Sequence, residues 1–108
     1  MTFVDLLSLE LHKAVVEKMR GDEGTVIRRA KANVARWLRN ENFRGEAGAP
    51  LREWQSILES NTPDEIGRLL ISQTDDAQRL RSSSPFTGIL TRKERDAILQ
   101  KCAEIEPV

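Results

Sequence analysis

Histidine and cysteine, the side chains that most often carry acid–base, nucleophilic or metal chemistry, occur once each in this sequence, as His12 and Cys102. A catalytic or metal-binding histidine needs partners at a fixed spacing. Glu10 and Glu17 stand two and five residues away, not the three or four residues that bring helical side chains together. Cys102 would need a nearby base to make its thiolate. We therefore expect His12 to be an ordinary surface or boundary residue and Cys102 to pack as a small hydrophobe.

Carboxylates gather between Glu59 and Asp76, and Asp75 and Asp76 are adjacent. A metal site needs carboxylates that converge on one point, whereas neighbouring residues of a helix point about 100° apart. We expect the two aspartates to favour the positive N-terminal end of a helix instead. Gly45 and Gly48 lack the strand, lysine and hydroxyl of a phosphate-binding loop. The sequence therefore predicts no catalytic residue, no metal or other cofactor and no small-molecule substrate, and we do not expect an enzyme.

Arginine and aromatic side chains indicate protein binding, because they are enriched among the anchors of protein interfaces. Residues 79–91 combine two arginines, five hydroxyls and one aromatic ring. They also suit a structural role, in which the aromatic ring docks onto the core and the hydroxyls cap helix ends. Both tryptophans lie on apolar stripes of their segments and so suit a core equally well. The predicted partner contacts are Trp37, Trp54, Arg79, Arg81 and Phe86.

The 17 basic and 17 acidic residues balance to a formal charge of zero, so no overall field recruits nucleic acid or an anionic membrane. Their distribution is uneven. Residues 28–52 hold seven basic and two acidic side chains, and residues 79–95 hold five basic and one acidic. These blocks are either solvated helix faces or patches that recognise an acidic partner. Whether the two blocks meet in space is left open by the sequence.

Nucleic-acid binding is the alternative function. The basic helix at 28–39 is one route, although it lacks interleaved aromatic side chains for base stacking. Residues 62–82 are the second route, because they resemble a degenerate helix-turn-helix. The expected turn glycine is missing there, and the element that would enter the major groove begins with Asp75 and Asp76. Six acidic residues and one basic residue give positions 53–78 a net charge of −5, which phosphates would repel.

The elements that must position these side chains are helices, because apolar residues recur three or four positions apart along most of the chain. Gly21 is a stop signal for the first helix. Thr62-Pro63-Asp64-Glu65 combines an N-cap hydroxyl, a proline in the first turn and a glutamate that can close a capping box. Thr91-Arg92-Lys93-Glu94 predicts a second capping box. We expect five or six short helices: at about 2–20, about 25–40, from Pro50 through Leu58, from Thr62 through Leu70, around Ala77 and Leu80, and from Thr91 to Ile105.

No stretch alternates apolar and polar residues in the manner of a strand. The sequence therefore predicts one all-α domain over residues 1–108, a compact bundle of five to six short helices. No run approaches the roughly 20 apolar residues of a membrane span, and no charged segment precedes an apolar one as in a signal peptide. We expect a cytoplasmic protein without membrane contact. A single cysteine leaves no intramolecular disulfide.

Three stretches of the sequence have a familiar arrangement: Leu11-His12-Lys13 with Val15-Val16-Glu17-Lys18-Met19-Arg20, Trp37-Leu38, and the segment from Arg79 to Thr91. Together they resemble small, uncharacterised helical bacterial proteins that are found in two-gene cassettes of the toxin–antitoxin type. The resemblance implies a non-catalytic companion protein. Combined with the arginines and aromatics above, it predicts a protein–protein interaction module, antitoxin-like or chaperone-like, that binds and occludes a partner protein or associates with itself.

Overall fold

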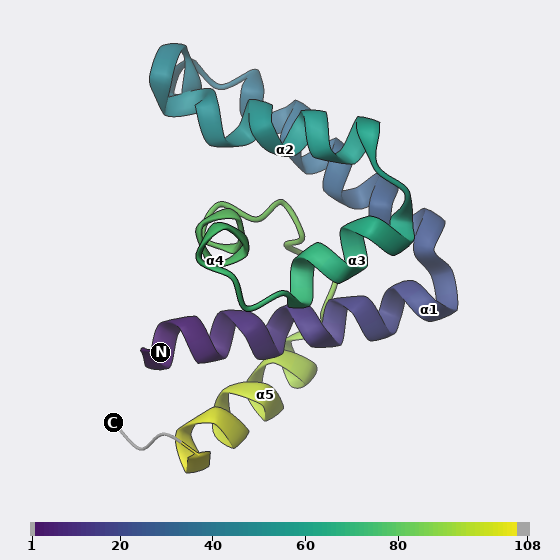
Figure 1. Cartoon of the computed structure of the whole chain (residues 1–108), viewed down its shortest axis with the longest axis vertical. Coiled ribbons are helices and arrows are strands. Elements are labelled where there is room, and N and C mark those ends of the chain that lie inside the picture. The colour runs from purple at the N-terminus through teal and green to yellow at the C-terminus, as the bar shows by residue number, and fades with distance from the viewer. Residues whose placement is uncertain (1, 106–108) are drawn as a thin grey trace.

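A computed structural model describes residues 2–105 of the chain, and all of its regular elements in that range are helical (Figure 1). The prediction of an all-α bundle is confirmed. The predicted domain also includes residues 1 and 106–108, which lie outside the described residues. The elements are α1 (Phe3–Leu38), the 3-10 turns η1 (Glu41–Phe43) and η2 (Gly45–Gly48), α2 (Ala49–Ser60), α3 (Pro63–Ile71), α4 (Asp75–Arg81) and α5 (Arg92–Ile105).

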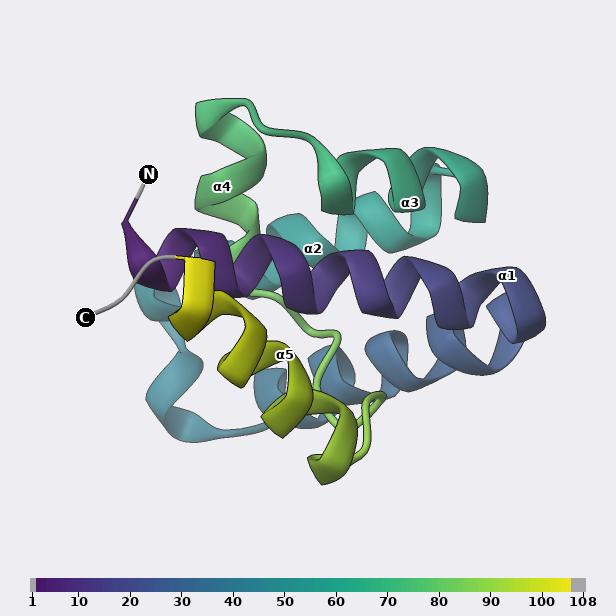
Figure 2. The same ribbon diagram turned by 90° about the horizontal axis from the view of Figure 1, so that it is seen from below.

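Helix α1 is sharply kinked, and its second half turns back beside the rest of the molecule (Figures 1 and 2). Asp22 has non-helical backbone angles, φ −158° and ψ 73°. Its carboxylate accepts the backbone N–H and the hydroxyl of Thr25, at 3.2 and 2.6 Å, which is how an N-cap residue starts a helix. We call residues 3–21 the N-terminal arm and residues 23–38 the C-terminal arm. They correspond to the first two predicted helices.

The predicted capping boxes are present in the structure. The Thr62 hydroxyl accepts the Glu65 N–H at 3.2 Å, and the Glu65 carboxylate accepts the Thr62 N–H at 2.9 Å. The same exchange joins Thr91 to Glu94 before α5. These reciprocal bonds satisfy N–H groups that a helix end otherwise leaves without a partner. Helix boundaries set by such local chemistry therefore follow the prediction closely.

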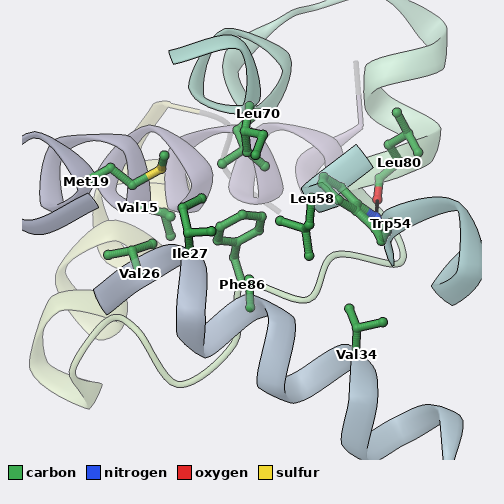
Figure 3. Close-up of a cluster of buried hydrophobic side chains, with 12 residues drawn as sticks. Val15, Met19, Val26, Ile27, Val34, Trp54, Leu58, Leu70, Leu80 and Phe86 are labelled. Carbon is green, nitrogen blue, oxygen red and sulfur yellow. Dashed lines mark hydrogen bonds between the residues drawn. The ribbon is translucent and has the colours of Figure 1, made fainter. Parts of the chain in front are cut away.

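The core lies between the two arms of α1, α2, α3, α4 and the connection after α4 (Figure 3). Trp54 is fully buried, and its Nε1–H donates to the Leu80 carbonyl at 2.9 Å. The Phe86 ring packs edge-on against Trp54, with centroids 5.8 Å apart, an arrangement that aromatic pairs prefer. Cys102 is buried on the inner face of α5, which confirms its predicted core role.

Helix α5 packs along the N-terminal arm (Figures 1 and 2). One ion pair ties them, from Lys18 Nζ to Glu94 Oε1 at 2.8 Å. No helix within residues 2–105 has the length and apolar character needed to cross a membrane.

Candidate functional site

A groove of about 420 Å³ opens where the C-terminal arm, the two 3-10 turns and the start of α2 meet the segment after α4. Local sequence builds this corner. The Asn40 side chain accepts the Asn42 N–H at 2.9 Å and starts η1. At Gly48 a Cβ would lie only 2.1 Å from the Phe43 carbonyl oxygen, so only glycine allows so close an approach. The groove is lined by Trp37, Phe43, Ala47, Pro50, Leu51, Ser82, Ser83 and Ser84.

Two half-buried aromatic side chains, Trp37 and Phe43, give the groove its apolar character. Three exposed arginines adjoin them. The Arg36 guanidinium lies 6.0 Å from the centroid of the Trp37 ring, within cation–π range. Arg44 follows Phe43 in the chain, and Arg52 donates to the Gly45 carbonyl at 2.7 Å. The groove is therefore apolar, and these three arginines outnumber the two exposed glutamates of the 3-10 turns, Glu41 and Glu46.

Of the five predicted partner contacts, only Trp37 lies in this groove. Trp54, Arg81 and Phe86 are 0%, 4% and 7% exposed, so they stabilise the fold and are not presented to a partner. The apolar stripe of α2 turns Trp54 inward against α4. For Trp54 and Phe86, the core role that the sequence also allowed is the one that the structure shows.

Arg79 is exposed, but its charge is already matched within the chain. It donates two hydrogen bonds to the carboxylate of Glu53, at 2.8 and 3.0 Å, and two to Oδ1 of Asp76, at 3.1 and 2.7 Å. The bond to Arg79 lowers the pKa of Glu53, and the bonds to both carboxylates raise the pKa of Arg79. Arg79 therefore ties α4 to α2, and Trp37 and Arg79 are the only predicted contacts left on the surface.

His12 and Ser84 form a pair that sequence reasoning missed. His12 is 8% exposed, more buried than expected. Its Nδ1 lies 2.7 Å from the Ser8 carbonyl oxygen and its Nε2 lies 2.7 Å from Ser84 Oγ. Because a carbonyl only accepts, Nδ1 carries the proton and Ser84 donates to Nε2. The two residues stand 72 positions apart, so no local signal could have revealed the contact.

A serine that donates to an imidazole is the starting geometry of nucleophilic catalysis. Here the Ser84 oxygen also accepts the Phe86 N–H at 3.1 Å. The hydroxyl thus holds Phe86 against the core, and its neighbour Ser83 donates to the Leu80 carbonyl at 3.3 Å. These contacts give the serines structural roles at the end of α4. Within residues 2–105 no three His, Cys, Asp or Glu side chains are grouped to hold a metal ion.

The two basic blocks of the sequence are in contact in the structure. The Asn33 side chain donates to the Pro85 and Thr87 carbonyls, at 2.9 and 3.0 Å, which holds the connection after α4 on the C-terminal arm. A Cβ at Gly88 would lie 2.7 Å from Arg29 Nη2. Residues 28–52 and 79–95 are therefore in contact at Arg29 and Gly88.

Helices α3 and α4, joined by residues 72–74, occupy the place of the predicted helix-turn-helix. Three of the seven residues of α4 are buried, and its exposed first turn carries Asp75 and Asp76. The first turn of α4, which would enter the major groove of DNA, is therefore negatively charged.

The chain matches no protein-family model, no curated protein and no solved structure. The groove, its charge and its aromatic lining are the observations from which a function can be argued.

Proposed function

We propose that this chain is a non-catalytic interaction module that takes an apolar side chain of an acidic partner protein into the groove between Trp37 and Phe43. One observation carries the proposal: two half-exposed aromatic rings line a groove of about 420 Å³, Trp37 from α1 and Phe43 from η1. Aromatic and arginine side chains are over-represented among residues that dominate binding energy. A concave apolar site of this size accommodates a leucine or phenylalanine side chain.

The charge around the groove favours an acidic partner. Arg36, Arg44 and Arg52 are exposed, and no ion pair within residues 2–105 engages any of them. They belong to the block 28–52, which has seven basic and two acidic residues. Exposed charges of one sign steer an oppositely charged partner and speed its association, an effect that salt screens.

The resemblance to companion proteins of two-gene cassettes supports a specific source for the partner. We propose that it is the product of an adjacent gene and that this bacterial, antitoxin-like or chaperone-like chain occludes it in the cytoplasm. A second copy of the chain is the competing occupant, because residues 53–78 carry a net charge of −5 that complements the three arginines beside the groove.

Nucleic-acid binding stays a second candidate because of one surface. Arg28, Lys31 and Arg39 are exposed on the C-terminal arm, and no ion pair within the described chain neutralises them. Phosphate contacts of this kind weaken by orders of magnitude between about 50 and 200 mM salt. Steeply salt-dependent retention on duplex DNA, lost on replacing these three residues but not Trp37, would favour this candidate.

Co-purification tests the interaction proposal. The chain is co-expressed with the products of its adjacent genes, and the retained partner is quantified. We expect Trp37→Ala and Phe43→Ala to release the partner, because each removes a wall of the groove. Val4→Ala is the matched control, since Val4 is 71% exposed and lies on the N-terminal arm, outside the groove.

Two results would count against the groove. One is a partner retained by both aromatic variants as strongly as by the unaltered chain. The other is the absence of any retained partner together with a monomeric chain in light scattering, because neither a gene neighbour nor a second copy would then occupy the site.

A further inference from the structure

A cavity of about 610 Å³ opens at the kink of α1, where both arms meet the connection between α4 and α5. Its volume lies within the range of small-molecule sites, about 300–1,000 Å³. It shares no lining residue with the Trp37 groove. An inference about this cavity, which we call the kink cavity, is therefore independent of the proposed partner protein.

Two exposed arginines of the C-terminal arm line the kink cavity without an ion pair. The Arg29 guanidinium lies against Gly88, where an added Cβ would lie 2.7 Å from Nη2. The Arg28 guanidinium turns back toward the kink, and its Nη2 donates to Thr25 Oγ1 at 3.3 Å. No ion pair of residues 2–105 engages either arginine. Both side chains therefore keep N–H donors and charge for a ligand.

The other charged groups of the lining, Lys18 and Asp22, already have partners within the chain. Lys18 Nζ pairs with Glu94 at 2.8 Å and donates to the Ile89 carbonyl at 3.3 Å. The Asp22 carboxylate accepts the hydroxyl and the N–H of Thr25. The positive charge that remains for a ligand is therefore that of the two arginines.

The rest of the ligand is indicated by the apolar part of the wall. Val26 is 6% exposed and Ile89 is half-buried, and both line the kink cavity. A compact apolar group placed against them would remove apolar surface from water. For the charged part, a phosphate monoester carries about −1.5 to −2 at pH 7 and three acceptor oxygens. It matches two arginines better than a carboxylate, which carries a single charge.

We propose that the kink cavity binds a phosphate monoester of a compact apolar group. The phosphate pairs with Arg29, and Arg28 supplies the second positive charge. The apolar group lies against Val26 and Ile89. This small-molecule site goes beyond the interaction with a partner protein, because it lies on a different part of the chain.

Titration of the whole chain with phenyl phosphate tests the site. Nitrogen-15 spectra follow the Arg29 Nε–H signal, and methyl spectra follow Ile89. We expect both signals to shift saturably. The Kd should be lower than for inorganic phosphate, which lacks the apolar group, and lower than for benzoate, which carries one charge. All titrations are made at matched ionic strength. The Arg79 Nε–H signal is the internal reference and should not move, because Glu53 and Asp76 already engage it.

Two matched variants separate the kink cavity from the general charge of the C-terminal arm, with binding followed at the Ile89 methyl signal. Arg29→Gln should weaken phenyl phosphate binding about five- to tenfold, between the effect of an exposed ion pair and that of a hydrogen bond to a charged group. Arg39→Gln should leave the Kd unchanged. Arg39 is also exposed on this arm without an ion pair in the described chain, but it does not line the kink cavity.

Three results would overturn the proposal. The first is a response of Arg29 and Ile89 to phenyl phosphate no larger than their response to chloride. The second is an equal loss of binding in the Arg29 and Arg39 variants, since the ligand would then respond only to the overall charge of the arm. The third is tighter binding of benzoate than of phenyl phosphate. A DNA duplex that shifts Arg29 and Arg39 together, where phenyl phosphate shifts neither, would assign these arginines to nucleic acid instead.

Discussion

The imidazole of His12 links α1 to the connection after α4 through two short hydrogen bonds, to the Ser8 carbonyl and the Ser84 hydroxyl. Burial lowers the pKa of His12, and the nearby charge of Arg81 acts in the same direction, while the bond to Ser8 opposes them. The neutral ring is therefore the form that fits this fold.

Stability should depend on pH through His12. The unfolded chain protonates its histidine at about pH 6.5, above the lowered pKa of the folded state. The unfolded state thus binds more protons just below that pH, so stability is full above it and falls as the pH decreases. We expect the urea midpoint of unfolding to be lower at about pH 5.5 than at about pH 7.5. Carboxylates have pKa values near 4 and titrate below this pH range, so they do not account for the difference.

The variant His12→Gln provides the control, since His12 is the only histidine. It should lose most of the difference between the two pH values, whatever its overall stability. An equal fall in the unaltered chain and in the variant would assign the effect to another group and contradict this account of His12.

Sequence reasoning at the residue scale succeeded where the environment is local. Cys102 lies behind Leu99 and Ile98 on a helical stripe, and it is buried as predicted. Trp37 and Trp54 lie on equivalent stripes, yet only Trp54 meets α4 and becomes buried. That difference depends on which helices pack against each stripe, and the spacing of residues along a single helix does not predict this packing.

The connection between α4 and α5 depends on a glycine. Gly88 has φ +75°, a backbone conformation that residues with a Cβ adopt only at a cost. Added to this, a Cβ at Gly88 would lie 2.7 Å from Arg29 Nη2. The two constraints act together, because the connection lies directly against the C-terminal arm.

Replacing Gly88 with alanine should lower the free energy of unfolding by about 1–3 kcal/mol, the cost of a strained backbone conformation. Gly21→Ala is the matched control, since Gly21 lies within the helical span of α1, with negative φ and no neighbour within 4 Å of an added Cβ. That change should be neutral or stabilising. Denaturant unfolding of both variants checks the contrast, and equal effects would mean that the Arg29 contact and the φ value do not govern this connection.

Most helix ends were predictable because their signals are local. Thr62 with Glu65, and Thr91 with Glu94, form the expected capping boxes. The groove was not predictable, because the apolar residues within 40–49 have no helical spacing and this segment indicates only a loop. Its shape comes from η1, η2 and the close approach at Gly48, contacts that no periodic pattern encodes.

At the scale of the whole molecule, charge is separated along the chain. Residues 28–52 are basic and residues 53–78 are acidic, so the zero formal charge is the sum of two oppositely charged segments. Most of the residues that line the Trp37 groove belong to the basic segment. Association with an acidic partner should therefore be fastest at low salt, while the apolar contact in the groove should persist at high salt.

Fluorine spectra of the chain labelled with 5-fluorotryptophan test the groove most directly, because the sequence contains only Trp37 and Trp54. On addition of the co-purified partner, we predict a shift of the Trp37 resonance and none of the Trp54 resonance, which is buried and serves as an internal control. The Trp37→Phe variant assigns the two signals. A complex that forms by light scattering while the Trp37 resonance stays unchanged would contradict the proposal that this groove binds the partner.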